Sequence, residues 1–499
     1  MQIDRQRLIA VIDKVRNGQG HVGVLGLGVS GLAVSTALLA VGSRISAFEG
    51  LSQEAYLAKV DAHSKIAPLK TGGVEIFWGA SELPVDINLD LLVVSPGVPP
   101  SSKIITAARL GEVPIISELE LSLLLSGCSS IIITGSNGKT TTVSLISHLL
   151  RSCGVRAALC GNIGTPLIST MTADQVRSGL KQDLDCVVVE ASSYQLEGAC
   201  FLSPNVSGVL NISENHLERH GSLEAYTKAK LQVYAGQENS AFSLVNVDDS
   251  KIIEYLGQLK GHRVDISIDR LRCSSSDFVA IEGVSDNGGE SLDISIGAVK
   301  GRIKLGRSQL AGVHNLYNIA FSVAAVIGQG VTDLLLIEES IGTFSALPHR
   351  IEQFAIKNKR FYFNDSKSTS VAAIEAAISA VQKVKPNAGV VVLVGGLRKK
   401  SNWGVLWQRL QDSSRYKVFS FGKDGAAIAE DAARHSVKIE YLGMLRELFK
   451  GAELIDQINS LAADFEVVLF TPGCASFDEF SGFEERGDLF KNYICGLPD

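Results

Sequence analysis

A glycine-rich turn in the first third of the chain carries the strongest chemical signal. Residues 130–134 read SIIIT and run directly into TGSNGKTT at 134–141. Backbone N–H groups in such a turn, with the positive end of the following helix, bind phosphate oxygens. Lys139 would neutralise the β- and γ-phosphates, and the Thr140 hydroxyl would ligate Mg²⁺. The strict P-loop pattern needs a glycine where Ile133 stands, so we predict nucleotide binding by a shorter variant.

A second glycine turn lies near the start of the chain. Gly26-Leu27-Gly28-Val29-Ser30-Gly31 follows the apolar residues 21–25, and Glu49 ends the next predicted strand. This spacing is typical of dinucleotide-binding turns, but any diphosphate satisfies the same chemistry. Because a nucleotide site is predicted downstream, we favour a substrate that carries a diphosphate. An NAD site and a purely structural turn remain as alternatives.

Polar residues follow two predicted strands behind the phosphate turn. Glu190 follows residues 186–189, and the segment that contains His216 follows residues 206–210. The carboxyl ends of parallel strands collect ligands, and Glu190 is a hard oxygen ligand of the kind that Mg²⁺ prefers. Lys230 would suit a metal site only after conversion to an anionic group, because an ammonium repels the ion. Taken singly, each of these residues is more typical of an ordinary surface or core position; their placement at successive strand ends behind the phosphate turn favours a site.

Apolar segments alternate with helical stretches along most of the chain, as in an α/β fold with parallel sheets. We expect helices at 32–41 and from the phosphate turn to about residue 152. Residues 251–301 are rich in Ser, Asp and Gly, which predicts a small β excursion or surface loops. The predicted strands are 21–25, 44–48, 90–95, 130–134, 186–189, 206–210, 390–394 and 467–470.

Length and charge restrict the class of protein. At about 150 residues per domain, 499 residues predict about three domains. A net charge of −6 argues against broad binding to nucleic acid or to an anionic membrane. The N-terminal apolar run is too short for a signal peptide, and no run approaches a membrane span, so we expect a cytoplasmic protein. The eight cysteines form no CxxC pair and are expected to be free thiols.

Eight motifs in a fixed order together resemble the Mur ligase family. They span nearly the whole chain, and the last three resemble the branch that adds D-glutamate. The motifs are TGSNGKTT (134–141), GNIG (161–164), EASSYQLE (190–197), LNISENHLERH (210–220), HNLYN (314–318), LPHRIE (347–352), NDSKST (364–369) and CASFDEF (474–480).

The resemblance implies three domains: a Rossmann-like domain for a UDP substrate (1–117), a P-loop domain for ATP (118–346) and a Rossmann-like domain for the amino acid (347–499). It implies that ATP phosphorylates the carboxylate of UDP-N-acetylmuramoyl-L-alanine, and that D-glutamate then attacks the acyl phosphate. Expected cofactors are ATP and two Mg²⁺ ions. We expect a monomer with small-molecule substrates and neither nucleic-acid nor membrane partners.

The resemblance also assigns roles to residues that match the family's motifs. The catalytic residues would be Lys139, Glu190, His216 and Lys230. Metal ligands would be Thr140, Glu190, His216 and a carbamylated Lys230. ATP would contact Gly135, Ser136, Asn137, Gly138, Lys139, Thr140, Thr141, Asn162, Asn318, Arg350 and Asp365. The UDP substrate would contact Val29, Ser30, Glu49, Gly50 and Gly97. D-glutamate would contact His349, Lys367, Thr369, Lys399, Ser476, Phe477 and Phe483.

Several positions depart from the family's pattern: Trp403 is the aromatic residue of its segment, Ser370 stands where asparagine is common, and Glu49 replaces a usual aspartate. The segment 395–403 lacks the acidic residue usual after its double glycine, and Gly473 replaces a usual alanine. Three alternative functions remain open. The chain could be a Mur-type ligase for another amino acid or a folate-like substrate, an NAD-dependent oxidoreductase, or a nucleotide sensor without catalysis.

Overall fold

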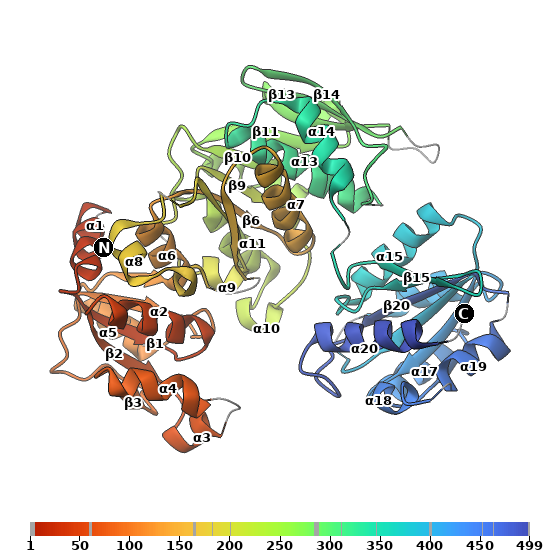
Figure 1. The fold of residues 1–499 in the computed structure, drawn as a ribbon, viewed down its shortest axis with the longest axis horizontal. Helices are drawn as coiled ribbons and strands as arrows, with labels where there is room; N and C mark the ends of the chain where they lie inside the picture. The colour runs from red at the N-terminus through yellow and green to blue at the C-terminus, as the bar shows by residue number, and fades with distance from the viewer. Residues whose placement is uncertain are drawn as a thin grey trace. The chain divides into compact units, whose positions relative to one another are not determined.

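The computed structural model describes residues 5–58, 62–162, 166–181, 183–199, 201–283, 289–310, 312–345, 347–398, 402–451, 453–462 and 464–497. These residues form three β-sheets with helices on their faces (Figure 1). The chain divides into two compact units. The first comprises Met1–Arg307 and Tyr317–Thr343, and the second comprises Ser308–Leu316 and Phe344–Asp499.

The first sheet of the first unit is a doubly wound parallel sheet in the order β3-β2-β1-β4-β5. The strand order reverses between β1 and β4, and such a switch point is where open α/β sheets bind ligands. The strands are β1 (His21–Leu25), β2 (Arg44–Glu49), β3 (Glu75–Trp78), β4 (Leu91–Val94) and β5 (Ile115–Ser117). The helices are α1 (Arg5–Arg16), α2 (Val29–Ala40), α3 (Gln53–Leu57), α4 (Ala62–Thr71), α5 (Lys103–Leu110) and α6 (Glu118–Ser126).

The second sheet of this unit has nine strands in the order β14-β13-β12-β11-β10-β9-β6-β8-β7. Its strands are β6 (Ser129–Thr134), β7 (Ala157–Gly161), β8 (Cys186–Glu190), β9 (Val206–Val209), β10 (Phe242–Asn246), β11 (His262–Ser267), β12 (Asp277–Glu282), β13 (Ser291–Ile296) and β14 (Val299–Lys304). The pairings from β7 to β12 are parallel, whereas β12, β13 and β14 pair antiparallel. The β excursion predicted for 251–301 is therefore present as an antiparallel extension of the sheet.

Helices and short 3₁₀ turns connect these strands. The α-helices are α7 (Lys139–Ser152), α8 (Ala173–Ser178), α9 (Ser193–Leu196), α10 (Leu217–His220), α11 (Leu223–Leu231), α12 (Ser250–Ile253), α13 (Val313–Gly328) and α14 (Leu334–Thr343). The 3₁₀ turns are η1 (Leu167–Thr170), η2 (Gln232–Tyr234), η3 (Leu256–Gln258) and η4 (Arg270–Arg272).

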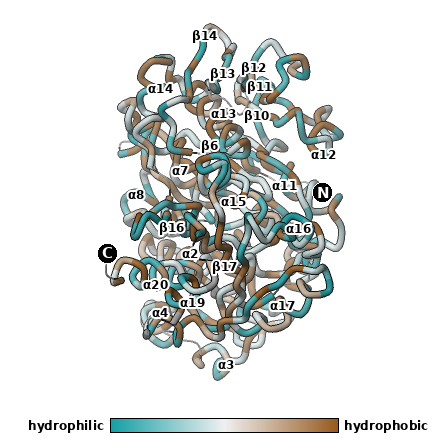
Figure 2. The backbone as a smooth tube through the Cα atoms, turned by 90° about the vertical axis from the view of Figure 1, so that its right-hand side faces the viewer, coloured by the Kyte–Doolittle hydropathy of each residue, from teal (hydrophilic) through white to brown (hydrophobic). Residues whose placement is uncertain are grey.

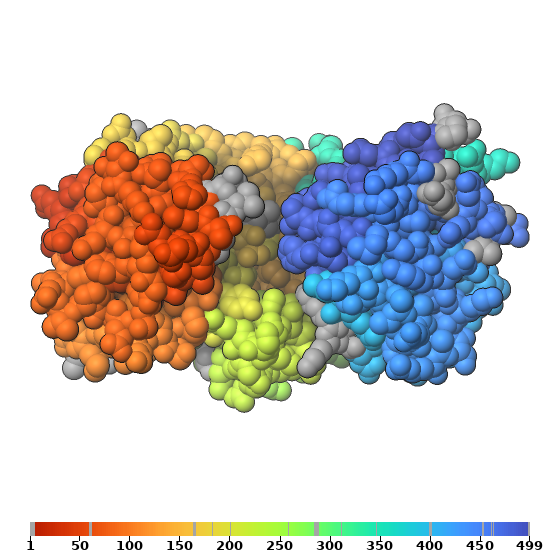
Figure 3. Space-filling model, turned by 90° about the horizontal axis from the view of Figure 1, so that it is seen from below, coloured from red at the N-terminus to blue at the C-terminus, as the bar shows by residue number. Residues whose placement is uncertain are grey.

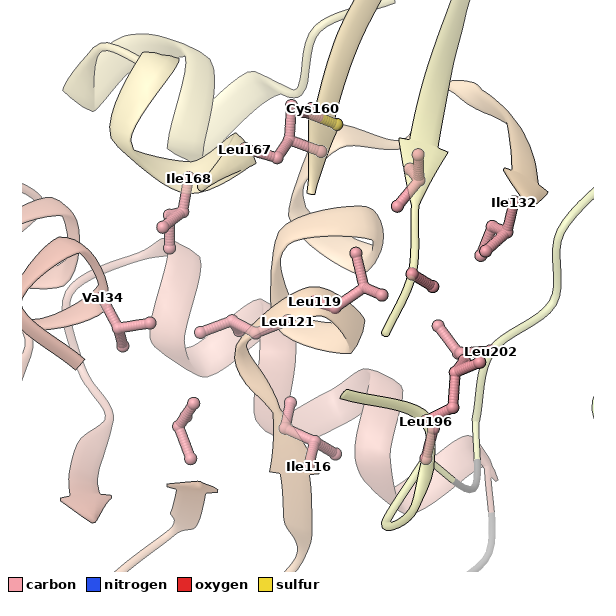
Figure 4. Close-up of a cluster of buried hydrophobic side chains, with 14 of the residues drawn as sticks. Val34, Ile116, Leu119, Leu121, Ile132, Cys160, Leu167, Ile168, Leu196 and Leu202 are labelled. Atoms are coloured by element: carbon pink, nitrogen blue, oxygen red, sulfur yellow. The ribbon is translucent and has the colours of Figure 1, made fainter. Parts of the chain in front are cut away.

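One continuous apolar core joins the two sheets of the first unit. Val34 of α2 and Leu121 of α6 belong to the same buried cluster as Ile168 of η1 and Leu196 of α9. Figure 4 shows side chains of this cluster converging from both parts of the unit. In the space-filling view of Figure 3, the orange surface of the first sheet's segment adjoins the yellow-green surface near residue 220. Burial of this shared apolar area explains why the two sheets form one compact unit.

The second unit has one six-stranded sheet in the order β15-β16-β20-β17-β18-β19. Its strands are β15 (Glu352–Lys357), β16 (Arg360–Asn364), β17 (Val390–Gly395), β18 (Tyr416–Phe421), β19 (Ile439–Tyr441) and β20 (Val467–Gly473). Its helices are α15 (Val371–Val384), α16 (Gly404–Leu410), α17 (Gly425–Ala433), α18 (Leu445–Leu448), α19 (Glu453–Leu461) and α20 (Phe483–Gly496).

Both faces of this sheet are apolar because helices cover both. Val390, Val392 and Val394 pack in the cluster with α15, α16 and α17, whereas Val391 and Leu393 pack with α18, α19 and α20. This alternation follows from the two-residue period of a strand. The central strand β17 is accordingly coloured as hydrophobic in Figure 2.

The α/β fold class and all eight predicted strands are confirmed; the strand at 21–25 has the predicted ends, and the other seven differ at one or both ends by one to three residues. The predicted helix at 32–41 begins earlier, at Val29, because Gly28 occupies the N-cap position. The domain boundaries at 117/118 and 346/347 stay predictions. Among the described residues, no helix combines the length and apolar character needed to cross a membrane.

Candidate active site

The turn 134–139 forms the predicted phosphate cradle. Gly135 and Gly138 have φ angles of 153° and 84°, which favour glycine, and Gly138 is the N-cap of α7. A Cβ at Gly138 would collide with Oδ1 of Asn318, so the missing side chain admits the predicted ATP residue Asn318. The Lys139 ammonium folds back over the turn and donates to the carbonyls of Gly135 and Ser136 at 2.8 and 3.1 Å.

Hydrogen bonds from the next strand end fix the shape of this turn. Ser136 donates its backbone N–H to the Asn211 carbonyl at 2.9 Å, and Asn137 donates to the Asn211 side chain at 2.9 Å. The Ser136 hydroxyl lies 3.0 Å from the Tyr226 hydroxyl. Thr141 is buried on the inner side of α7. The cradle is therefore held by β9 and α11 as well as by its own backbone.

Glu190 lies at the centre of a hydrogen-bonded group beside the cradle. It ends β8, the sheet neighbour of β6, and only 3% of it is exposed. The Thr140 hydroxyl donates to Oε2 at 2.8 Å, and the Asn162 amide donates to Oε1 at 3.0 Å. The structure thus brings together three residues that the sequence assigned to metal and ATP binding.

Lys230 is buried in the same region, on α11. Its ammonium donates to the Thr134 hydroxyl at 3.3 Å and lies 4.8 Å from the centre of the Tyr226 ring. Burial lowers the pKa of Lys230 well below its usual value; the Lys139 charge lowers it further and Glu190 opposes the shift. A low pKa raises the fraction of neutral amine, which is the form that reacts with electrophiles. Lys230 is therefore not an ordinary surface lysine.

His216 occupies a strained position at the start of α10. Its φ of 53° places a non-glycine residue in the left-handed region, which is uncommon. Its Nδ1 atom lies 3.3 Å from the Tyr194 hydroxyl and 3.5 Å from Glu218 Oε1. Strain of this kind concentrates at functional sites.

The donor set suits magnesium only together with a nucleotide. Among the described residues, no three His, Cys, Asp or Glu side chains lie close enough to hold a metal ion. Mg²⁺ is commonly bound by one or two protein oxygens plus substrate phosphates, and the Thr140–Glu190 pair matches that pattern. Lys230 in its ammonium form does not fit a metal site, whereas an anionic derivative would.

A cavity of about 630 Å³ lies between the two sheets of the first unit. Ligand-binding pockets commonly have volumes of about 300–1,000 Å³. Three of the residues predicted to bind the UDP substrate line it (Val29, Ser30 and Gly97), together with the predicted ATP residue Asn162. It is also lined by Tyr194, Gln195, Glu218 and Arg219 from the second sheet's segment.

Glu49 and Gly50, the other two predicted UDP residues, are not among the residues that line this cavity. The Glu49 carboxylate accepts the backbone N–H groups of Leu27 and Leu51 at 2.9 and 3.1 Å. It therefore fixes the first glycine turn. Gly31 lets α2 approach this turn, because a Cβ there would collide with the Gly26 carbonyl.

In the second unit, His349, Lys367 and Phe483 lie together. His349 has a φ of 63°, its Nδ1 lies 2.9 Å from the Asn364 amide, and its ring meets that of Phe483 edge to face. The Lys367 ammonium lies 3.8 Å from the centre of the same Phe483 ring. Three of the seven predicted D-glutamate residues thus form one cluster.

Asp365 is a buried carboxyl next to this cluster. It accepts from the Thr471 hydroxyl at 2.9 Å and from the Ile351 N–H at 3.3 Å. Burial raises the pKa of Asp365 to about 7, although both hydrogen bonds and the charges of Arg350 and Arg486 oppose the shift. The predicted ATP residues Arg350 and Asp365 are therefore electrostatically coupled.

The remaining predicted D-glutamate residues differ in exposure. Ser476 is buried, Thr369 is partly buried, and 72% of Phe477 is exposed. Lys399 lies outside the described residues. The unusual Gly473 has a packing reason, because a Cβ there would collide with the Ile374 side chain and come within 3.5 Å of Trp403.

Several buried polar residues were not predicted from the sequence. Arg486 of α20 is fully buried, and its guanidinium donates to the carbonyls of Ser366 and Cys474 at 2.8 and 3.2 Å. Glu118 of α6 is buried and hydrogen-bonded to the hydroxyls of Ser122 and Ser30. The types of these two residues alone do not reveal the contacts.

Comparison with known proteins agrees with this geometry. A family model described as the Mur ligase middle domain matches residues 133–326. The chain is 30% identical to UDP-N-acetylmuramoylalanine–D-glutamate ligase of Geotalea uraniireducens, over 95% of this chain and 97% of that protein. The chain belongs to the Mur ligase family. The proteins of the same description from Lactobacillus acidophilus and Koribacter versatilis are each 32% identical to this Mur ligase, over 94% and 95% of it and 96% and 97% of their own lengths.

Solved structures of Mur ligases share the fold. MurF from Acinetobacter baumannii superposes with a TM-score of 0.61 at 20% identity, covering 97% of this chain and 98% of that one. MurC from Thermotoga maritima gives a TM-score of 0.55 at 16% identity, over 96% and 100% of the two chains. At these identities the likeness concerns the fold, and it confirms the predicted Mur ligase architecture.

Proposed function

We propose that this chain is an ATP-dependent ligase that joins D-glutamate to UDP-N-acetylmuramoylalanine in the synthesis of peptidoglycan precursors. The similarity to ligases of this description over nearly their whole length supports the substrate pair. The observation that carries the chemistry is the group formed by Lys139, Thr140 and Glu190 at the ends of two neighbouring strands.

The proposed reaction begins with phosphoryl transfer in the first unit. Lys139 and the N-terminal end of α7 hold the phosphates of ATP, and Asn318 lies against the Gly138 turn near them. The substrate's terminal carboxylate attacks the γ-phosphorus and the bond to the ADP oxygen breaks, which gives an acyl phosphate. Such transfers depend mainly on positioning and charge stabilisation, which are the properties of this cradle.

Bound Mg²⁺ would neutralise the developing phosphate charge, with Thr140 and Glu190 as its protein ligands and His216 and a carbamylated Lys230 near a second ion. The chain's own contribution is orientation. Thr140 and Asn162 hold the two oxygens of Glu190, and Tyr194 holds the ring of His216. We propose the carbamate because the low pKa of Lys230 favours the neutral amine that reacts with carbon dioxide.

The sugar-nucleotide substrate is proposed to occupy the cavity of about 630 Å³. Ser30 and Gly97 line it from the segment of the first sheet. A diphosphate fits the first glycine turn, because α2 begins there and its N-terminal N–H groups favour an anion. The first glycine turn would then bind the diphosphate of the substrate, and no NAD is needed to account for its sequence.

D-glutamate is proposed to bind at the cluster in the second unit. Its two carboxylates need cations and hydroxyl groups, which Lys367, Thr369, Ser476 and Lys399 supply. The amine attacks the acyl carbon, the tetrahedral intermediate releases phosphate, and an amide bond remains.

Product analysis tests this proposal. The full chain would be incubated with ATP, UDP-N-acetylmuramoyl-L-alanine and D-glutamate, and the nucleotide-sugar product would be examined by mass spectrometry. We expect a product heavier by one glutamyl residue, formed with one ADP per product. Omission of ATP is the control, and a product formed without ATP would contradict a ligase mechanism.

A further inference from the structure

Arg219 of α10 lies on the wall of the cavity between the two sheets of the first unit, where the sequence assigned no role to it. Its guanidinium reaches in two directions. Nη2 donates to the carbonyl of Val98 at 2.7 Å, and both Nε and Nη2 donate to Glu197 Oε2 at 3.1 and 3.0 Å. Arg219 therefore links a turn of the first sheet's segment to the end of α9 in the second.

The turn that contains Val98 forms one side of the cavity. Gly97 lines the cavity, and Val98 donates its N–H to the Ser95 carbonyl at 3.0 Å. The Ser95 hydroxyl donates to the Gly26 carbonyl at 2.7 Å, so this turn rests on the first glycine turn. A shift of Val98 would be transmitted to the proposed diphosphate site.

On the side of the second sheet, the residues that contact Arg219 lie near His216. Glu197 follows α9, and its Oε1 lies 3.5 Å from His220 Nδ1. The guanidinium of Arg219 also lies 5.3 Å from the centre of the Tyr194 ring, whose hydroxyl approaches His216. The same arginine thus fixes groups on both walls of the cavity.

The Arg219–Glu197 pair differs from an ordinary surface ion pair. The two side chains are only 16% and 23% exposed, and the arginine satisfies a carboxylate and a peptide carbonyl at once. Exposed pairs contribute little, whereas truncation of one partner in a desolvated pair leaves the other charge without compensation. A lysine keeps the charge but lacks the planar fork that makes both contacts.

We infer that Arg219 is a positioning residue for the sugar-nucleotide substrate, because it holds the 95–98 turn against Glu197 and so sets the width of the cavity. This inference rests on the proposed function. Its guanidinium is engaged by Glu197 and Val98, so its effect on the substrate passes through these two contacts. A direct bond from Arg219 to the substrate's anionic groups is the competing explanation.

The test measures binding of UDP-N-acetylmuramoyl-L-alanine to the full chain by titration calorimetry. The variants are Arg219→Lys, Glu197→Gln and the double variant, each checked for folding by thermal melting. Glu197→Gln is the milder change and leaves the arginine intact. The matched control is Arg177→Lys. Arg177 also donates across to the first sheet's segment, to the Val41 carbonyl at 3.4 Å, but neither residue lines the cavity.

We expect each single variant to weaken binding by about tenfold or more, and the double variant to be no weaker than the worse single variant, because both remove the same link. The KM for ATP should change less than twofold, and Arg177→Lys should bind like the wild type. If Glu197→Gln binds normally or more tightly while Arg219→Lys binds weakly, Arg219 contacts the substrate directly and the positioning role is wrong.

Two other results would also overturn the inference. Wild-type affinity in both single variants would make the pair an ordinary ion pair, and equal weakening in Arg177→Lys would indicate general loosening of the unit. The wild-type chain is titrated first. If the wild type does not bind, the proposed substrate and this inference are both wrong. If the wild type binds and the variants do not behave as expected, only the inference about Arg219 is wrong.

Discussion

The Thr140 hydroxyl donates to Glu190 Oε2 at 2.8 Å, although the two residues are 50 positions apart in the sequence. The contact forms because β6 and β8 are parallel neighbours, so the residues after both strands meet at the same sheet edge. Asn162, which follows β7, joins Glu190 from the next strand. Three strand ends thus converge on one carboxylate beside the phosphate cradle.

Replacement of Lys139 tests the cradle. Lys139→Ala should lower kcat by about 10²–10³ or more, because a positioned positive charge that stabilises the transferring phosphoryl group is lost. Steady-state phosphate release measures the effect. Lys228→Ala is the control, since Lys228 is an exposed lysine paired with Glu224 at 2.6 Å on α11. Near-native turnover in Lys139→Ala would remove Lys139 from the mechanism.

Lys230 should behave as the precursor of an anionic ligand. We expect Lys230→Ala to lose most of its turnover and to regain part of it when a small carboxylic acid supplies the missing negative group. The same acid should leave the wild type unchanged. Full activity in Lys230→Ala without added acid would indicate that the buried lysine serves only the fold.

The strands could be predicted from the sequence where apolar side chains run without interruption. Residues in β6, β8, β17 and β20 are buried on both faces, and each of these strands contains an uninterrupted run of three or more apolar residues. The short edge strand β3 is only partly buried, and its apolar run is limited to Ile76–Trp78. Edge strands give a weak pattern because one side faces solvent.

The candidate site was predictable where a motif carries the chemistry. The glycine turns and Glu190 stand at strand ends that the pattern predicts. Arg219, Glu118 and Arg486 were missed because their roles depend on partners brought close by packing, such as Val98, Ser30 and Ser366. Glu49 was predicted for the ribose, and its carboxylate accepts one backbone N–H group of the glycine turn, that of Leu27, and one from Leu51.

The first glycine turn offers a matched pair of substitutions. Gly31→Ala should destabilise the fold by about 1–3 kcal/mol and raise the KM for the UDP substrate, because its Cβ would collide with the Gly26 carbonyl. Gly28→Ala meets no atom within 4 Å and should cost far less stability. Urea denaturation of both variants measures the difference. Equal stability in the two variants would contradict the proposed close contact.

Arg486 should stabilise the proposed D-glutamate pocket. Its guanidinium joins the loop that contains Ser366 to the loop that follows β20. Arg486→Met should destabilise the chain by about 2–4 kcal/mol, because buried carbonyls lose their donors. Arg486→Lys should fold and show a higher KM for D-glutamate with a smaller change for ATP.

Arg434→Lys is the control for this substitution. Arg434 is an exposed arginine at the C-terminal end of α17, and its Nη1 atom lies 3.9 Å from Asp431 Oδ1. Denaturation and initial rates would be measured for all three variants. An unchanged KM for D-glutamate in a folded Arg486→Lys chain would limit the role of Arg486 to stability.

Asp365 should make stability depend on pH. Burial raises the pKa of Asp365 to about 7, whereas an unfolded aspartate has a pKa near 3.9. Between about pH 4 and pH 7 the folded chain therefore binds the extra proton, and stability falls as the pH rises through this window. Relative to Asp365→Asn, which cannot ionise, the wild type should lose stability between pH 5 and pH 7.5. Parallel pH profiles for the two chains would contradict the raised pKa.

The choice of amino acid tests the central claim most directly. Phosphate release by the full chain would be measured with ATP and UDP-N-acetylmuramoyl-L-alanine, while D-glutamate, L-glutamate, L-alanine, L-lysine and meso-diaminopimelate are supplied one at a time. We predict rapid release with D-glutamate and background release with the other four. Release that depends on L-alanine or on a diamino acid instead would contradict the assignment of this chain as a D-glutamate-adding ligase.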